Sequence, residues 1–258
     1  MRLLHPSDFA ATPGHWGGRQ LIFDLQTKIK SILDPLIPDA IPIALLDYPN
    51  GTNVGDSLIW LGEVSYLKER SCRPKYVCDC ENYDGALLSR QMKQRGIILL
   101  SGGGNFGTLW PVIHRFRLRI LEEFRGQPVI QLPQSIYFED ESGILETARA
   151  IRRHGNFTLL VRDHASYEFA VRHFDCRVQI SPDMAFCIGP VRTQVQPRCD
   201  RFILARSDHE KAQDWLSVLE KSNGLSMIHD DWLDQYLPEK ILNRIQIHTQ
   251  RIRKALDP

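Results

Sequence analysis

The sequence of 258 residues lacks the features that mark several broad classes of protein. No apolar run approaches the roughly 20 residues of a membrane span, and the first 18 residues hold no sustained hydrophobic stretch typical of a signal peptide. We therefore expect a cytoplasmic protein without a transmembrane segment. Its 32 Lys and Arg residues are balanced by 31 acids, so there is no general field to hold nucleic acid or an anionic membrane. We expect no nucleic-acid partner, and any anion must be bound locally.

Paired C-x-x-C spacing is also missing. The six cysteines are scattered, so the sequence indicates neither a zinc site nor a disulfide framework, and we interpret them as reduced thiols. No internal repeat or low-complexity tract is present. The sequence thus indicates no metal and no cofactor, and it leaves the oligomeric state open between a monomer and a homo-oligomer.

Short apolar runs alternate with segments of helical period in the middle of the chain. The runs typical of strands are 41–48, 75–80, 96–101, 128–133 and 157–162. The segments typical of helices are 57–70, 85–95, 111–126, 144–155 and 166–175. In the first of these, Leu58, Leu61, Val64 and Leu67 recur at three-residue steps and indicate the packed face. This alternation predicts a Rossmann-like α/β domain over residues 40–190, a parallel sheet with helices on both faces.

The two ends of the chain differ from this middle part. Residues 1–39 are expected to form a helical segment, with an amphipathic helix at about 19–33. A polar seam at 187–200 contains two prolines and marks a domain boundary. Residues 200–258 then predict a small, incomplete second α/β lobe, with one clear strand from Arg201, a doubtful one near 225–229 and a helical tail.

Polar residues follow the expected strands. In a doubly wound sheet, ligands bind outside the carboxyl ends of the strands, so these segments should meet at one edge. They are "NGTNVGD" (50–56), "SGGGN" (101–105), "QLPQS" (131–135), "RDHAS" (162–166) and "SPDMAF" (181–186).

Three consecutive glycines, Gly102 to Gly104, call for a reason because each loses much backbone entropy on folding. A glycine loop before a helix lets amides face an anion, whereas the alternative is close packing of a helix on a strand. The spacing G-x-G-x-x-G from Gly102 to Gly107 is weak evidence for a dinucleotide, since the ribose-binding acid expected about 20 residues later is missing.

Arg162 ends an apolar run, where its planar guanidinium could bind a carboxylate or phosphate with two hydrogen bonds. An internal ion pair with Asp163 or Asp183 is the alternative. Asn53 and Asp56 fit a binding site or a scaffold equally well, because Asp56 could cap the following helix.

These motifs, in this order, resemble the polysaccharide pyruvyl transferase family. Family members show an N-x-G-D loop, a G-G-G-x loop, a Q-S and an R-D-x-x-S. The matching residues here are Asn53, Gly55 and Asp56; Gly102, Gly103, Gly104 and Asn105; Gln134 and Ser135; and Arg162, Asp163 and Ser166. The resemblance implies a glycosyltransferase-B-like fold of two lobes and transfer of a pyruvyl group from phosphoenolpyruvate to a saccharide, free or lipid-linked. It implies a place in bacterial exopolysaccharide or cell-surface polysaccharide synthesis.

Such a transfer needs anion clamps and a group that moves a proton. Beside Arg162 we consider His164 a candidate catalytic residue, with His209 next, whereas His114, His154 and His173 are expected on helix surfaces. Family members usually carry a D-R-x-H-G-type motif near the C-terminus, and this chain has no such sequence. We therefore expect that the chain ends before the fold does and has little or no transferase activity alone. A sugar-nucleotide glycosyltransferase and a non-catalytic saccharide-binding or partner-binding remnant are the alternatives.

Overall fold

The computed structural model describes residues 17–51, 53–93, 95–191, 199–204 and 227–230. Its helices are α1 (Gly17–Leu33), α2 (Val54–Glu69), α3 (Gly85–Met92), α4 (Pro111–Glu123), α5 (Glu141–His154) and α6 (His164–His173), with 3₁₀ helices η2 (Asp34–Leu36) and η3 (Met184–Ile188). The strands are β1 (Ile43–Leu46), β2 (Tyr76–Cys78), β3 (Ile97–Leu100), β4 (Gly103–Gly107), β5 (Val129–Tyr137), β6 (Phe157–Val161), β7 (Arg177–Ile180), β8 (Arg201–Leu204) and β9 (Met227–Asp230).

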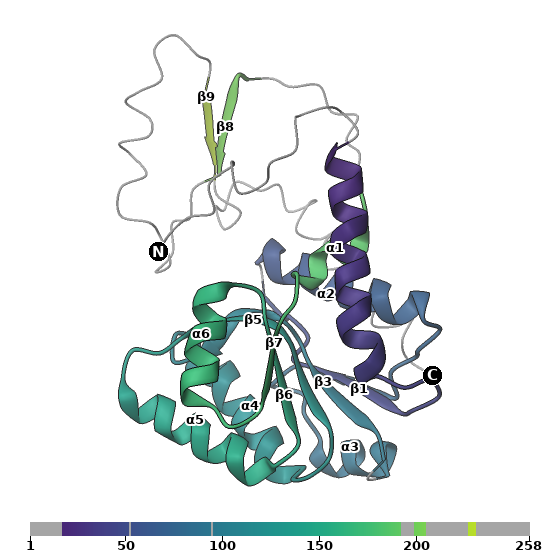
Figure 1. Cartoon of the computed structure of the whole chain (residues 1–258), viewed down its shortest axis with the longest axis vertical. Coiled ribbons are helices and arrows are strands. Elements are labelled where there is room, and N and C mark those ends of the chain that lie inside the picture. The colour runs from purple at the N-terminus through teal and green to yellow at the C-terminus, as the bar shows by residue number, and fades with distance from the viewer. Residues whose placement is uncertain (1–16, 52, 94, 192–198, 205–226, 231–258) are drawn as a thin grey trace.

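Seven of these strands form one parallel sheet: six follow the order β2-β1-β3-β5-β6-β7, and the seventh, β4, pairs with β5 beside this path (Figure 1). Strand β4 pairs with the second half of β5, beyond the part of β5 that pairs with β3. Strands β1 and β3 are buried along their whole length, because helices cover both faces of the sheet. The Rossmann-like parallel sheet with helices on both faces is confirmed.

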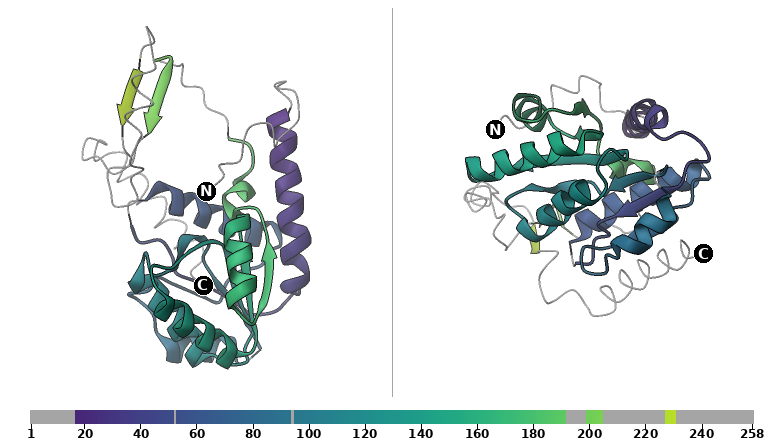
Figure 2. Two further views of the ribbon diagram at one scale, coloured as in Figure 1. Left: turned by 60° about the vertical axis from the view of Figure 1, so that its left-hand side comes forward. Right: turned by 90° about the horizontal axis from the view of Figure 1, so that it is seen from below.

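Two apolar cores lie on opposite faces of the sheet. One contains side chains from α1, α2 and η3, and the other contains side chains from α3, α4, α5 and α6. Figure 2 shows the helices around the sheet from two further directions. Helix α2 buries Ile59, Trp60, Tyr66 and Leu67, whereas Leu58 is exposed. Of the predicted face, Leu67 is also buried and Val64 packs against the core, so the three-residue spacing predicted the helix correctly and its packed face in part.

Two predicted loops are part of the sheet. Residues 103–107 form β4 instead of a loop, and Gln134 and Ser135 lie within β5 instead of after it. Parallel pairing between Gly103 and Gln134 explains both differences, because it extends the sheet past the apolar runs visible in the sequence.

Strands β8 and β9 pair in parallel as a separate two-stranded sheet. The strand predicted from Arg201 and the doubtful one near 225–229 are both confirmed. The helical tail and most of the proposed second lobe lie outside the described residues. Within the described part of the chain, no helix is both long and apolar enough to cross a membrane.

Candidate active site

The strand order places β1 and β3 side by side where the chain changes sides of the sheet. Helix α2 follows β1 onto one face, and α4 follows β3 onto the other. Ligands of open α/β sheets bind at such a point, outside the carboxyl ends of the strands. We define the carboxyl edge as the residues at this end of the sheet, which follow the strands or, in β4 and β5, lie at and beyond the end of β3: 47–51, 53–56, 101–105, 131–135, 162–166 and 181–186.

The first turn of α2 forms one side of this edge. Asn53 is the N-cap of the helix, and its Oδ1 accepts a hydrogen bond from the amide of Gly55 at 2.9 Å. Asp56, which we considered as the cap, lies one turn further in. Its Oδ1 is 3.6 Å from the position that a β-carbon would take at Gly103. The N-x-G-D and glycine segments therefore meet, although their sequence positions are almost 50 residues apart.

The glycine segment is held by side chains. The amide of Gly102 donates to Glu63 Oε1 at 2.7 Å, and the amide of Asn105 donates to Gln134 Oε1 at 3.1 Å. These two amides are occupied, so they do not form the free row expected for an anion. A β-carbon at Gly102 would lie 2.7 Å from the carbonyl oxygen of Pro133. Close packing explains this glycine, as in the alternative considered from the sequence. The close contact is between two strands, however, and not between a helix and a strand.

Gly104 has a different role, because Arg162 packs on it. A β-carbon there would be 3.1 Å from Nη2 of Arg162. Nε of Arg162 donates to Ser135 Oγ at 2.9 Å, and Nη1 donates to Asp183 Oδ2 at 2.6 Å. The expected ion pair with Asp183 is thus present. Nη2 has no hydrogen-bond acceptor among the described residues, and the side chain is 30% exposed.

Asp163 fixes the segment that carries this arginine. Its Oδ1 accepts from the amide of Ser166 at 2.8 Å as the N-cap of α6, and its Oδ2 accepts from Ser135 Oγ at 2.7 Å. Burial raises the pKa of Asp163, but the hydrogen bonds from Ser166 and Ser135 outweigh it and hold that pKa below the ordinary value. Asp163 is therefore ionised at neutral pH, and Ser135 links it to Arg162.

A second arginine, Arg117 of α4, lies beneath the carboxyl edge and was missed in the sequence. Its side chain is 1% exposed. Nη2 donates to Asp47 Oδ2 and to Asn105 Oδ1, each at 2.7 Å, and Nε donates to Gln131 Oε1 at 2.9 Å. Asn105 Oδ1 also accepts from Gln134 Nε2 at 2.9 Å. Arg117 thus joins the residue that follows β1 to β4 and β5 in one buried network.

Helical period is the signal that could have found the buried charged residues. Arg117 lies between the buried Phe116 and Ile120 on α4. Glu63 of α2, 1% exposed, is three residues after Trp60 and three before Tyr66. A charged residue on the packed face of a helix needs partners, and both were missed because those partners lie 39 and 70 positions away in the sequence.

The histidines differ in their surroundings. His164 is the first residue of α6; it is exposed and makes no hydrogen bond with the described residues. His114 and His154 are buried, so their expected place on helix surfaces is wrong, while His173 is exposed as expected. His209 lies outside the described residues. Within the part of the chain that the structure describes, no group of three or more His, Cys, Asp or Glu could hold a metal ion.

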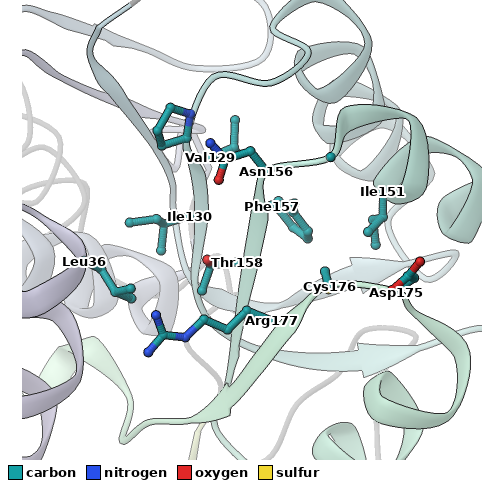
Figure 3. Close-up of a pocket in the computed structure, with 12 residues that line it drawn as sticks. Leu36, Val129, Ile130, Ile151, Asn156, Phe157, Thr158, Asp175, Cys176 and Arg177 are labelled. Atoms are coloured by element: carbon teal, nitrogen blue, oxygen red, sulfur yellow. The ribbon is translucent and has the colours of Figure 1, made fainter.

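A hollow of about 390 Å³ lies at the opposite, amino ends of β5, β6 and β7. Leu36 and Arg177 line one side of it, and Ile151, Cys176 and Asp175 line the other (Figure 3). None of the predicted site residues belongs to this hollow. Polar side chains that converge, rather than the size of a cavity, therefore favour the carboxyl edge as the candidate site.

Comparison with known proteins supports the same assignment. "Putative pyruvyl transferase EpsO" of Bacillus subtilis is 33% identical over 214 residues, which cover 78% of this chain and 65% of that protein. "Pyruvyl transferase 1" of Schizosaccharomyces pombe is 29% identical over 206 residues, 74% of this chain and 51% of the relative. "General stress protein 30" of Bacillus subtilis is 28% identical over 204 residues, which cover 76% of this chain and 59% of that protein. The chain thus spans between about half and two-thirds of these relatives.

The family description "Polysaccharide pyruvyl transferase" matches residues 53–253. The match begins at Asn53, the N-cap of α2, and includes every motif that we placed on the carboxyl edge. Both the extent of the match and the order of the motifs lead to one conclusion: this chain belongs to the polysaccharide pyruvyl transferase family.

Proposed function

We propose that the carboxyl edge binds phosphoenolpyruvate and that the protein transfers its pyruvyl group to two hydroxyls of a saccharide as a ketal. The observation that carries the donor assignment is Arg162, whose Nη2 is free of acceptors among the described residues and lies beside Gly104. A guanidinium held by Ser135 and Asp183 is already oriented, so a carboxylate or phosphate can add to it at little entropic cost.

The chemistry defines what the site must supply. A proton adds to the methylene carbon of phosphoenolpyruvate, positive charge develops at the central carbon, and a sugar hydroxyl attacks it while losing its proton. The bond to phosphate then breaks, phosphate leaves, and a second hydroxyl attacks in the same way. One hydroxyl proton balances the proton added to the methylene, and the other leaves with phosphate.

Roles follow from position on the edge. Arg162 clamps the anion, Gly104 leaves room for its guanidinium, and Asn105, Gln134 and Ser135 orient the groups around it. His164 is our candidate for proton transfer, since it is exposed at the start of α6. The acceptor belongs to bacterial exopolysaccharide or cell-surface polysaccharide, and the reaction takes place in the cytoplasm.

Incubation with phosphoenolpyruvate and a panel of glycans, followed by measurement of released phosphate, tests the proposal. We expect saturable donor binding and glycan-dependent release of phosphate. A parallel panel of nucleotide sugars is the counter-test. Consumption of a nucleotide sugar, or the absence of binding to either donor, would replace this proposal with the glycosyltransferase or the non-catalytic alternative.

Arg162→Lys probes the clamp itself. A lysine keeps the charge but cannot contact Ser135, Asp183 and a donor oxygen at once, so phosphoenolpyruvate binding should weaken by roughly 1 to 3 kcal/mol. Calorimetric titration measures this loss of affinity for phosphoenolpyruvate. Arg177→Lys, at the start of β7 and remote from the edge, is the matched control and should bind like the wild type. Equal affinity for the Arg162→Lys protein would make Arg162 a structural residue.

A further inference from the structure

Glu63 is a buried acid that the proposed chemistry does not use. It lies in the middle of α2 and faces the ends of β3 and β4. Its Oε1 accepts the Gly102 amide at 2.7 Å and the Ser101 hydroxyl at 3.1 Å. The carboxyl group therefore holds the chain at the turn between β3 and β4, immediately before the glycines of the donor site.

The second oxygen of this group has no partner. Glu63 Oε2 is buried and makes no hydrogen bond with the described residues. An ionised carboxylate would leave a charged oxygen without solvent or a donor, which costs far more than leaving a neutral O–H there. The geometry by itself favours the protonated acid.

The charges around Glu63 act in the same direction. Asp47 at the end of β1 and Asp183 at the start of η3 are the acids that repel its ionised form, and Cys187 of η3 is also near enough to interact. The guanidinium of Arg117 is the opposing charge, but it already contacts Asp47. Burial, aided by the two acids, raises the pKa of Glu63 to about 8, against the hydrogen bonds from Gly102 and Ser101.

We propose that Glu63 is a positioning residue of the donor site that acts as a neutral acid: it holds the Ser101–Gly102 backbone in place, and binding of an anionic donor requires it to carry a proton. This inference rests on the proposed function. Among the described residues, the charged side chains of the site are two arginines, Arg117 and Arg162, and four acids, Asp47, Asp56, Asp163 and Asp183. A further negative charge at Glu63 would oppose an anion in a poorly solvated place.

Linkage makes the proposal measurable. If the donor binds better when Glu63 is protonated, binding must draw a proton onto Glu63, since coupling between two bound species is reciprocal. Phosphoenolpyruvate is fully ionised at pH 8, because phosphate monoesters lose their second proton near pH 6. A proton that is taken up on binding at pH 8 therefore goes to the protein and not to phosphoenolpyruvate.

Calorimetric titration of phosphoenolpyruvate in buffers of different ionisation enthalpy measures this uptake. The wild type should take up a substantial fraction of one proton at pH 8, and its affinity should fall up to about tenfold per pH unit above 8. Glu63→Gln keeps an acceptor for Gly102 and is neutral at every pH, so its uptake should be near zero and its affinity flat. Glu69→Gln, exposed in the last turn of the same helix, should match the wild type. Equal uptake by Glu63→Gln overturns the proposal.

A ligand-free measurement separates this proposal from the function on which it rests. An acid whose pKa rises from 4.5 to about 8 on folding contributes stability that is complete below 4.5 and is lost as pH rises through 8. The stability of Glu63→Gln relative to wild type should therefore increase between pH 5 and 8. If no donor binds at all, the proposed function fails, while this comparison still decides the state of Glu63. Should Glu63→Gln not fold, infrared difference spectra of the wild type must show a protonated carboxyl that titrates near pH 8, and its absence contradicts the proposal.

Discussion

Single buried polar residues determine how the carboxyl edge is held. Arg117 occupies a place where an apolar side chain would pack, and its contacts with Asp47, Gln131 and Asn105 replace the water that it has lost. An apolar residue there would not orient Asn105, whose Oδ1 accepts from both Arg117 and Gln134. The burial of this arginine therefore fixes geometry at the site, whatever it contributes to stability.

Replacement of Arg117 should be costly because it leaves an acid unpaired. In Arg117→Met, Asp47 is buried without its cation, so the free energy of unfolding should fall by about 3 to 5 kcal/mol. Urea denaturation measures the change. Arg119→Met on the same helix removes an exposed pair with Glu123 and an exposed cation–π contact with Tyr83, and should cost no more than about 1 to 2 kcal/mol. Similar losses in both variants would show that the buried network is unimportant for stability.

Gly104 is the residue whose replacement should separate binding from stability. The β-carbon of Gly104→Ala would meet Nη2 of Arg162 at 3.1 Å, and the flexible side chain can move away. We expect a weakening of phosphoenolpyruvate binding by roughly 1 kcal/mol with a stability change within about 0.5 kcal/mol. Gly18→Ala in α1, which is outside the carboxyl edge and where no atom lies within 4 Å, is the control. Unchanged donor affinity in Gly104→Ala would show that the contact between Gly104 and Arg162 does not matter for donor binding.

At the scale of elements, His114 joins three of them. Its Nδ1 accepts from the amide of Gly107 in β4 at 3.1 Å, so Nε2 carries the proton and donates to Thr147 Oγ1 of α5 at 2.8 Å. Burial, with a smaller effect of the Arg117 charge, lowers its pKa from 6.5 to about 4. This histidine is a structural group in the neutral form and has no place in proton transfer.

The change His114→Ala should destabilise the fold by about 2 to 4 kcal/mol, because it opens a cavity and leaves buried groups unpaired. It should also alter the dependence on pH. The unfolded state binds a proton at His114 below 6.5 and the folded state does not until about 4, so the wild type loses stability as pH falls across that interval. Thermal unfolding of both proteins at pH 4.5 and 7 checks this, and parallel curves would contradict it.

The contact between α2 and η3 depends on a glycine. A β-carbon at Gly62 would lie 1.8 Å from the carbonyl oxygen of Met184. Gly62→Ala must push η3 away and should destabilise the protein by about 2 kcal/mol or more. The same change at Gly18 in α1, where there is open space, should stay within about 0.5 kcal/mol. Calorimetric melting temperatures test the pair, and a Gly62→Ala protein as stable as Gly18→Ala would contradict the close packing.

The elements differ in how well their sequences predict them. Apolar runs predicted β1, β3 and β6, since strands covered on both faces consist almost entirely of apolar residues. They did not predict β4, because glycines have no side chains to carry a pattern and its pairing with β5 depends on residues about 30 positions away. Helix α2 was predicted, but its packed side only in part, because Gly62 and Glu63 interrupt the apolar pattern on that side.

For the whole molecule, topology accounts for the part of the site that sequence could predict. Parallel strands bring the segments after them to one edge, so the convergence of Asn53, Gly103 and Arg162 followed from the order of elements, whereas Gln134 joins them from within β5 by its pairing with Gly103. Arg117 and Glu63 reach that edge from the middle of helices on opposite faces. No spacing relative to a strand end reveals them, and only the assembled fold shows that they meet the same backbone.

The two edges of the sheet offer two places for a ligand, and this contrast gives the most direct test. Phosphoenolpyruvate can be titrated into the ¹⁵N-labelled chain while the backbone amide resonances are followed. The account predicts saturable shifts at Gly103, Gly104 and Ser135 on the carboxyl edge, with smaller shifts in Arg162→Lys at equal donor concentration. Saturable shifts confined to Asn156, Thr158 and Arg177 around the opposite hollow, or no saturable shift on the carboxyl edge, would contradict it.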